Sequence, residues 1–526
     1  MHTMSVDSKS QLKRAIQGFF SLTVSKVVFL LAGYVVYFSL PRLFGSADLF
    51  GDYIVIINLL NIFNMVLITG TIQAVSKFVS EDETRDRAVR KAAYKIQAVI
   101  GGCAFLLLFI GAPFYANTFN DPSLTPYIRL SAFIPVCYAF YAVMIGSLNG
   151  RRAYTRQAAL DISFAMIKTT GILVLAGLGF GVLGALSGFI AAAFIIVFIA
   201  TILVVKTAPS CAMDIKFPVK QILVFELYVM IFTFLNNLLL ATDILMVKSI
   251  LNEKYHLISI GLTNLVNSFL FPGHPVPSNL ELVQKIPSIL SGYYGAVLTF
   301  SRIPYTFVTA ISLVAFPMVS KVSFEKNLSK MQDYIRQTLR LTGLIVVPIA
   351  LVFVAFPSEF LGFVYPSDYI MGKEALCILP IGEIMLSMMF VSIAMITGSG
   401  FPKISVMITA ITLCCDVILC YLLIPRYALA GAALASTVAW TAGFIMTNVW
   451  LKVRFKSNIP AMTAVRLVVA GGVALLTAVY APGSGLLKIF VGFFILIAVY
   501  GTILIILKEI GIAELTIYTR QLFKRR

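Results

Sequence analysis

Residues 182–205, VLGALSGFIAAAFIIVFIATILVV, contain no charged side chain and show no alternation of apolar and polar residues. An apolar run of about 20 residues is long enough to cross the hydrocarbon core of a bilayer as a helix. Strands of a membrane β-barrel alternate apolar and polar residues over about 10 positions, so this run favours a helix. A helix also satisfies every peptide group internally, which lipid cannot do. The stretch therefore predicts a transmembrane α-helix.

Similar apolar runs recur along the whole chain. Of its 526 residues, 59% are apolar and 12% are charged, whereas a soluble domain has about 45–50% and about 25%. Such a chain has too little polar surface to cover itself in water. We expect an all-α polytopic membrane protein with about fourteen transmembrane helices.

The basic residues are concentrated in alternate loops between the apolar runs. The chain has 41 Lys and Arg against 23 Asp and Glu, a net charge of +18. In a soluble protein this excess would suggest nucleic acid as a partner, but Lys and Arg also mark the cytoplasmic loops of membrane proteins. The pattern predicts that both termini are cytoplasmic and that no nucleic acid binds.

The chain contains an internal repeat. Four pairs of similar segments lie about 240–250 residues apart: 51–53 with 292–294, 75–77 with 319–321, 146–152 with 398–403, and 184–187 with 431–436. The consistent offset maps the first six spans onto the next six in the same orientation. Transporters are often built from such repeats, with the substrate site between them.

The repeat predicts two pseudo-symmetric six-helix lobes followed by an appended helix pair. The expected segments are a cytoplasmic N-terminal segment 1–18, an N-lobe 19–205 (spans 1–6), a C-lobe 221–451 (spans 7–12) with an outer loop at about 249–288, the appended spans 13–14 in 461–507, and a basic cytoplasmic tail 508–526.

Seven short stretches in a fixed order resemble the polysaccharide flippases (Wzx/RfbX-like polysaccharide biosynthesis proteins) and their relatives, the lipid II flippases. These belong to the superfamily that also holds the MATE exporters. The stretches are PRLFG (41–45), FGDY (50–53), LNGRR (148–152), GFGVLGA (179–185), GYY (292–294), RIP (302–304) and FPMVSK (316–321). The resemblance covers about residues 15–455 and contains no catalytic signature. The outer loop is longer than the family's usual connection.

The resemblance implies a MATE-like fold whose two lobes enclose a central cavity with alternating access. It implies a flippase that moves a polyprenyl-pyrophosphate-linked oligosaccharide across the cytoplasmic (inner) membrane for export of cell-surface polysaccharide. The partners would be this lipid-linked glycan and the bilayer, and other polysaccharide-assembly membrane proteins are candidate partners.

Two other functions stay open at this point. A MATE-type, cation-coupled exporter of small molecules shares the duplicated fold. A membrane-embedded glycan polymerase or ligase needs an outer loop with catalytic charges, and the loop here carries few. We therefore do not expect an enzyme. The chain has no GxxxxGK[ST] phosphate-binding loop, and its three His and seven Cys lack metal-ligand spacing, so neither ATP nor a metal is expected.

Three basic residues inside expected spans are candidate substrate-binding residues: Lys26, Lys168 and Arg302. A charge in the hydrocarbon costs about 2.5–3.5 kcal/mol on insertion scales, so it usually faces a cavity or a partner. A pyrophosphate needs cationic donors in such a cavity. Lys26 and Lys168 lie near the cytoplasmic ends of their spans and could instead extend to the aqueous boundary. Arg302 lies deeper and precedes Pro304, which can kink the helix.

Four acidic residues inside expected spans are candidates for coupling to H⁺ or Na⁺: Asp243, Glu226, Asp416 and Glu383. On the expected span 7, Glu226 and Asp243 share one helix face with Thr233 and Asn236. Such a polar stripe either carries a coupling ion or faces a water-filled cavity, and the sequence leaves both alternatives open.

Overall fold

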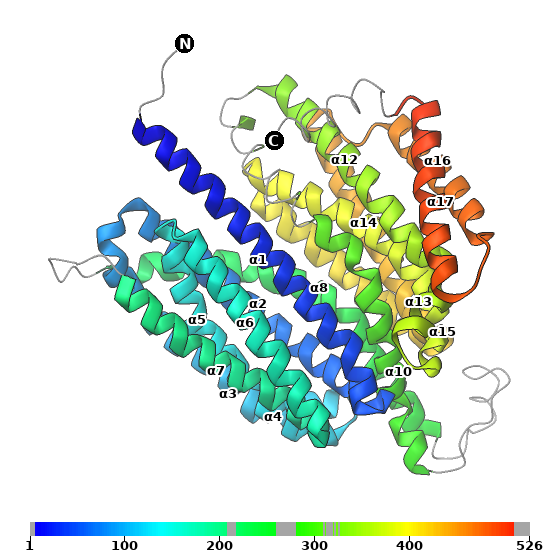
Figure 1. Cartoon of the computed structure of the whole chain (residues 1–526), viewed down its shortest axis with the longest axis horizontal. Helices are drawn as coiled ribbons and strands as arrows, with labels where there is room; N and C mark the ends of the chain where they lie inside the picture. Colours follow the sequence, from blue (N-terminus) through cyan, green and yellow to red (C-terminus); the bar gives the residue numbers. More distant parts are fainter. Residues whose placement is uncertain are drawn as a thin grey trace. The chain divides into compact units, whose positions relative to one another are not determined.

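The computed structural model describes residues 6–207, 217–258, 280–308 and 327–509, together with residues 311, 319, 322 and 323. In this part of the chain, helices follow one another with only short turns between them (Figure 1). Eleven of the helical segments are long and apolar enough to cross a membrane. The predicted all-α, polytopic membrane architecture is confirmed.

The eleven segments agree with about fourteen expected spans because two of them are 54 residues long and hold two spans each. The first changes direction at Ala176–Phe180, where Gly179 has a φ of 89°. The second, α15 (Pro402–Phe455), is broken at Ala428. The remaining expected span begins with α10 (Leu280–Ser301).

The duplication is visible in the backbone at these two breaks. Gly181 has φ 54° and ψ −138°, and Ala428 has φ 46° and ψ −122°. The two positions are separated by the repeat offset. Equivalent positions of the two repeats therefore adopt the same left-handed conformation, although only the first of them is a glycine.

Several expected segments lie outside the described residues, in whole or in part. They are residues 1–5 of the N-terminal segment, 208–216 between the lobes, 259–279 of the outer loop, most of the repeat landmark at 319–321, and 510–526 of the basic tail.

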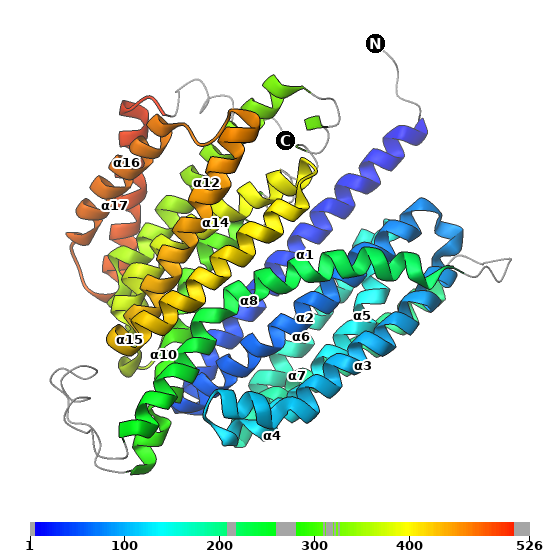
Figure 2. The same ribbon diagram turned by 180° about the vertical axis from the view of Figure 1, so that it is seen from behind.

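The contacts within the chain divide it into two compact units. Unit 1 consists of Met1–Thr263 and Val276–Gly292, and unit 2 consists of Asn264–Pro275 and Tyr293–Arg526. This division differs from the expected lobes, because α8 (Val219–Ile258) and the first turns of α10 belong to unit 1. The physical reason is that α8 packs along α2 (Ala47–Glu81) (Figure 2). The repeat boundary and the packing boundary are thus different.

The helices of unit 1 surround α2, and 67% of the residues in the most apolar stretch of α2 are buried. Helix α2 packs against α5 and α8, α1 packs against α6, and α6 packs against α7. The other bounds are α1 Val6–Phe44, α3 Asp86–Thr118, η2 Pro122–Leu124, α4 Thr125–Ser131, α5 Phe133–Gly150, α6 Tyr154–Leu175 and α7 Gly181–Thr207.

Unit 2 is built around α14, which packs against both halves of α15 and against α12. The bounds are α12 Leu328–Ala355, α13 Pro357–Val364, α14 Lys373–Gly398, α16 Ala461–Val479 and α17 Gly485–Ile506. The appended pair α16–α17 packs on α12 through Leu351 and Leu467. Beyond α17, Glu509 bonds to Arg340 on α12 and Arg466 on α16, which fastens the pair to the unit.

Candidate functional site

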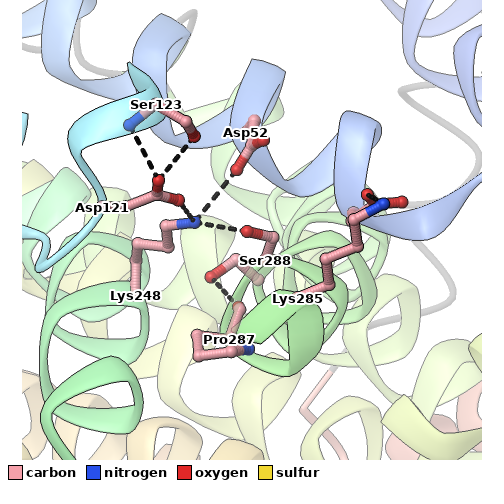
Figure 3. A network of polar contacts seen from close by, with 9 residues as sticks. Asp52, Asp121, Ser123, Lys248, Lys285, Pro287 and Ser288 are labelled. Atoms are coloured by element: carbon pink, nitrogen blue, oxygen red, sulfur yellow. Dashed lines mark hydrogen bonds and ion pairs between the residues drawn. The ribbon is translucent and has the colours of Figure 1, made fainter. Parts of the chain in front are cut away.

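Four elements of unit 1 converge on the side chain of Lys248, which is 0% exposed (Figure 3). Its ammonium nitrogen lies 3.0 Å from Oδ1 of Asp52 on α2 and 2.7 Å from Oδ2 of Asp121, between α3 and η2. It also donates to the hydroxyl of Ser288 on α10. We call Lys248, Asp52, Asp121 and Ser288 the Lys248 network.

The backbones of α2 and α10 touch beside this network. A Cβ on Gly51 would lie 1.7 Å from the carbonyl oxygen of Ser288, and one on Gly292 would lie 2.3 Å from that of Ala47. Both contacts require the absence of a side chain. These glycines are the repeat landmarks found in the sequence, so the equivalent segments of the two repeats meet here.

The charges of the Lys248 network depend on one another. Removing one partner of a buried ion pair costs about 3–5 kcal/mol, because the other charge is left unpaired. Asp121 also accepts from the Ser123 amide at 3.2 Å and its hydroxyl at 2.5 Å. Burial raises the pKa of Asp121, but Lys248 and the Ser123 bonds lower it more, so the net pKa is below its ordinary value.

A second ion pair lies beside the network at the same end of α2 and α10. The Nζ atom of Lys285 is 3.8 Å from Oδ2 of Asp48, and 51% of the Lys285 side chain is exposed. A pair this exposed contributes about 0–1 kcal/mol. Sequence reasoning missed the Lys248 network because Lys248 lies just past the expected span 7. The signal that could have found it is Asp52, a charged residue inside the repeat landmark 51–53.

Two of the predicted basic residues lie where α1 packs on α6. Lys26 Nζ is 3.0 Å from Oδ2 of Asp161, and 67% of the Lys26 side chain is exposed. Asp161, which the sequence did not single out, also accepts from the Tyr141 hydroxyl at 3.3 Å.

Lys168 is half-buried and lies over aromatic rings. Its Nζ is 4.5 Å from the ring centre of Phe29, 5.2 Å from that of Phe189 and 5.9 Å from that of Phe164. Ring faces attract a cation through the negative charge on the face of the π-system. Among the residues that the structure describes, Lys168 makes no ion pair with a carboxylate.

Glu226 on α8 is fully buried between α2 and α3. Its Oε1 atom accepts from Thr71 at 2.6 Å and from Gln97 at 2.5 Å. Its Oε2 atom has no hydrogen-bond partner in the described part of the chain. Asp243, on the same predicted stripe, is also buried and accepts from the Ile244 amide at 2.8 Å. Because 17 residues of helix separate them by about 25 Å, the two acids form separate positions.

In unit 2, Arg302 and Glu383 both interact electrostatically with the hydroxyl of Tyr305. Arg302 follows the last residue of α10 and is half-buried, and Glu383 on α14 is fully buried. Asp416 is separate from this pair in its contacts: it accepts from the Ser436 hydroxyl at 3.1 Å and packs the two halves of α15 together. In the described residues, no group of three metal-ligating side chains is arranged to hold a metal ion.

Family profiles match two long segments of the chain. Residues 40–265 match the family described as polysaccharide biosynthesis protein, and residues 287–422 match MatE. Together the two matches cover more than half of the chain.

Two curated proteins are similar to parts of this chain. The probable low-salt glycan biosynthesis flippase Agl15 of Haloferax volcanii is 24% identical over 42% of this chain and 47% of its own length. The uncharacterized membrane protein YabM of Bacillus subtilis is 23% identical over 80% of this chain and 76% of its own length. The chain thus spans about half the length of Agl15.

Two solved structures share the fold. Lipid II flippase MurJ, in an inward closed conformation, has a TM-score of 0.70 with 14% identity over 94% of this chain and 99% of MurJ. A MATE transporter in complex with MaL6 has a TM-score of 0.59 with 14% identity over 84% of this chain and 96% of that chain. The MATE-like fold expected from the sequence is confirmed.

Proposed function

Because this chain belongs to the superfamily of membrane transporters that contains the polysaccharide flippases, MurJ and the MATE exporters, we propose that it flips a lipid-linked oligosaccharide. The substrate carries a polyprenyl pyrophosphate and moves from the inner to the outer leaflet of the cytoplasmic membrane. The polysaccharide biosynthesis match and the name of Agl15 support this substrate class.

The observation that carries the proposal is the environment of Lys168. A half-buried lysine whose ammonium lies over three Phe rings, with no carboxylate partner among the described residues, suits an anionic headgroup. Phosphate oxygens form short, strong hydrogen bonds with such donors. Lys26, whose side chain is 67% exposed, and Arg302 are proposed as further substrate-binding residues.

The test compares Lys168→Gln with Lys168→Arg in proteoliposomes that contain a polyprenyl-pyrophosphate oligosaccharide. We expect Lys168→Gln to lower translocation about tenfold or more, because a charge-assisted hydrogen bond contributes about 1.5–3 kcal/mol. Lys168→Arg should retain much of the rate. Translocation is measured as the glycan that a membrane-impermeant glycosidase can reach.

Lys77→Gln is the matched control. Lys77 also lies over two rings, 4.7 Å from the centre of Phe225 and 5.2 Å from that of Phe78, but its side chain is exposed on α2. Its translocation rate should equal that of the wild type. A wild-type rate in Lys168→Gln, at equal protein content, would remove Lys168 from the substrate site.

A second candidate function is export of small cationic molecules. The MatE match over residues 287–422 and the buried acids Glu226 and Glu383 favour it. In the same proteoliposomes, uptake of a fluorescent cation without any glycan translocation would select this function over the first.

Coupling to H⁺ is proposed at Glu226, with Asp243, Asp416 and Glu383 as further candidates. Glu226 is preferred because one carboxyl oxygen holds two hydrogen bonds while the other has no partner among the described residues. Na⁺ prefers several oxygen ligands, whereas a proton needs only one carboxyl oxygen.

A further inference from the structure

A cavity of about 540 Å³ lies between α1 and α6, at the last turns of both helices. Four of its lining residues belong to α1 and two to α6: Phe38, Ser39, Arg42, Leu43, Leu173 and Val174. Its volume is within the range of small-molecule sites, about 300–1,000 Å³. Both helices belong to unit 1, and Arg42 lies in PRLFG, a stretch to which the proposed function gives no role.

The two helices run parallel, so their last turns lie at the same end of the unit. Lys26 pairs with Asp161 at 3.0 Å, and the Thr169 hydroxyl donates to the Ala32 carbonyl at 3.4 Å. The partners are 135 residues apart in the first contact and 137 in the second. Continuing this register along the helices brings the residues after Ser39 beside Leu173 and Val174, where the cavity lies.

The lining combines one cation and one hydroxyl with four apolar side chains. Arg42 is exposed, and a guanidinium carries five N–H donors in a planar fork that matches phosphate oxygens. The Ser39 hydroxyl can supply a further donor. Free phosphate would leave the Phe and Leu side chains without a ligand. The lining therefore suits an amphipathic ligand that has an anionic headgroup and a hydrocarbon chain.

The rim of the cavity is apolar and exposed. Leu43 and Val174 are exposed, and so are Leu178 and Phe180 in the turn that follows α6. A contiguous surface of this kind on a membrane-spanning helix pair is a contact surface for lipid. A lipid chain can therefore enter the cavity from the bilayer without crossing a polar surface.

Arg42 lies at the depth of lipid headgroups. The apolar segment of α1 is Ser21–Phe44, so Arg42 is two residues from its end. From Lys26 to Arg42 the helix rises about 24 Å, most of the hydrocarbon thickness of about 30 Å. An arginine there keeps its guanidinium at the interface. With the expected cytoplasmic N-terminus, this end of α1 is in the outer leaflet.

We propose that this cavity binds an anionic phospholipid of the outer leaflet, with the phosphate on Arg42 and an acyl chain against Leu173 and Val174. The occupant is a bilayer lipid, because an α-helix turns about 100° per residue, which puts Arg42 about 160° around α1 from Lys26. Arg42 thus faces away from the candidate substrate-binding side of the helix. The inference goes beyond the proposed function and is independent of which substrate is moved.

Thermal unfolding of the purified full chain in detergent measures this binding, because a ligand of the folded state raises the melting temperature. Phosphatidylglycerol should reach half of its maximal shift at a lower concentration than phosphatidylcholine or diacylglycerol with the same chains. Inorganic phosphate alone should give no shift. Arg42→Gln should raise the half-saturating concentration of phosphatidylglycerol about tenfold, because it removes a charge-assisted hydrogen bond. The value for diacylglycerol should not change.

Two further variants separate the cavity from general attraction of anionic lipid. Val174→Trp fills the apolar part, so it should weaken the binding of phosphatidylglycerol and of diacylglycerol alike. Arg426→Gln is the matched control. Arg426 is an exposed arginine beside the break in α15 and is not among the residues that line the cavity. Its variant should bind phosphatidylglycerol as the wild type does.

Several outcomes would overturn the proposal. One is an equal half-saturating concentration of phosphatidylglycerol and phosphatidylcholine in the wild type, which needs no variant. Others are wild-type binding in Arg42→Gln, or an equal loss in Arg426→Gln. Displacement of phosphatidylglycerol by a lower concentration of a polyprenyl pyrophosphate would assign the cavity to the substrate instead, and a shift with inorganic phosphate alone would assign it to a free anion.

Discussion

Glu226 is the residue proposed for coupling to H⁺, and its hydrogen bonds indicate what a proton there would change. The Thr71 hydroxyl lies 2.6 Å from Glu226 Oε1 and 2.6 Å from the Leu67 carbonyl oxygen. A hydroxyl has one hydrogen to donate. Thr71 donates to Oε1 of an ionised Glu226, whereas a protonated Glu226 can donate to the Thr71 oxygen and leave the Thr71 hydrogen for Leu67. A protonated Glu226 therefore satisfies both contacts.

We predict that Glu226→Gln abolishes transport driven by a pH gradient but leaves substrate exchange intact. The amide mimics a protonated carboxyl, so exchange of substrate across the membrane should continue at about the wild-type rate. Accumulation driven by a pH gradient should be lost. Both are measured in proteoliposomes with and without the gradient, and Glu359→Gln, whose partner is Lys488, is the control. Gradient-driven accumulation in Glu226→Gln would contradict the assignment.

At the residue scale, the sequence identified charged side chains but not their partners. Apolar surroundings alone predict that Lys26 and Glu226 need a partner. The partners lie far away in the chain: Asp161 is 135 residues from Lys26 and Gln97 is 129 residues from Glu226. No local pattern encodes such pairs, because helix packing alone brings them together.

At the element scale, helix lengths and turns follow from local chemistry. Gly179 and Gly181 predict a turn that permits positive φ, and the first 54-residue segment bends there. In the second repeat the sequence predicts a turn at 425–427, and the break falls beside it at Ala428. Sequence could not place it more closely, because alanine gives no signal for a left-handed conformation.

Ala428 is strained by this conformation, and we predict that Ala428→Gly stabilises the protein. A non-glycine residue at such φ and ψ costs about 1–3 kcal/mol, while the added freedom of the unfolded chain costs about 0.4–1 kcal/mol. The net gain should be about 1 kcal/mol, seen as a higher melting temperature in detergent. Gly181→Ala should destabilise by a similar amount. A lower melting temperature for Ala428→Gly would contradict the shared geometry.

At the scale of the whole molecule, charge distribution predicts orientation. We expect Lys285→Cys, in a cysteine-free variant, to react with an impermeant thiol reagent on intact cells. Lys77→Cys should react only after the membrane is permeabilised, because it lies near the end of α2 that leads into the basic segment 85–95. Both side chains are exposed, so access to the reagent decides the result. The reverse labelling pattern would show that the protein has the opposite orientation, with the Lys248 network on the cytoplasmic side of the membrane.

The packing of α8 has a consequence for how such proteins can recombine. By ancestry α8 opens the second repeat, yet it lies along α2 in unit 1. A chimaera joined between α7 and α8 would pack the α8 of one parent against the α2 of the other. Glu226 and Lys248 would then come from one parent and their partners on the earlier helices from the other. A junction after Gly292 would inherit both sets of contacts whole. The modular unit for exchange between relatives is therefore larger than the ancestral half.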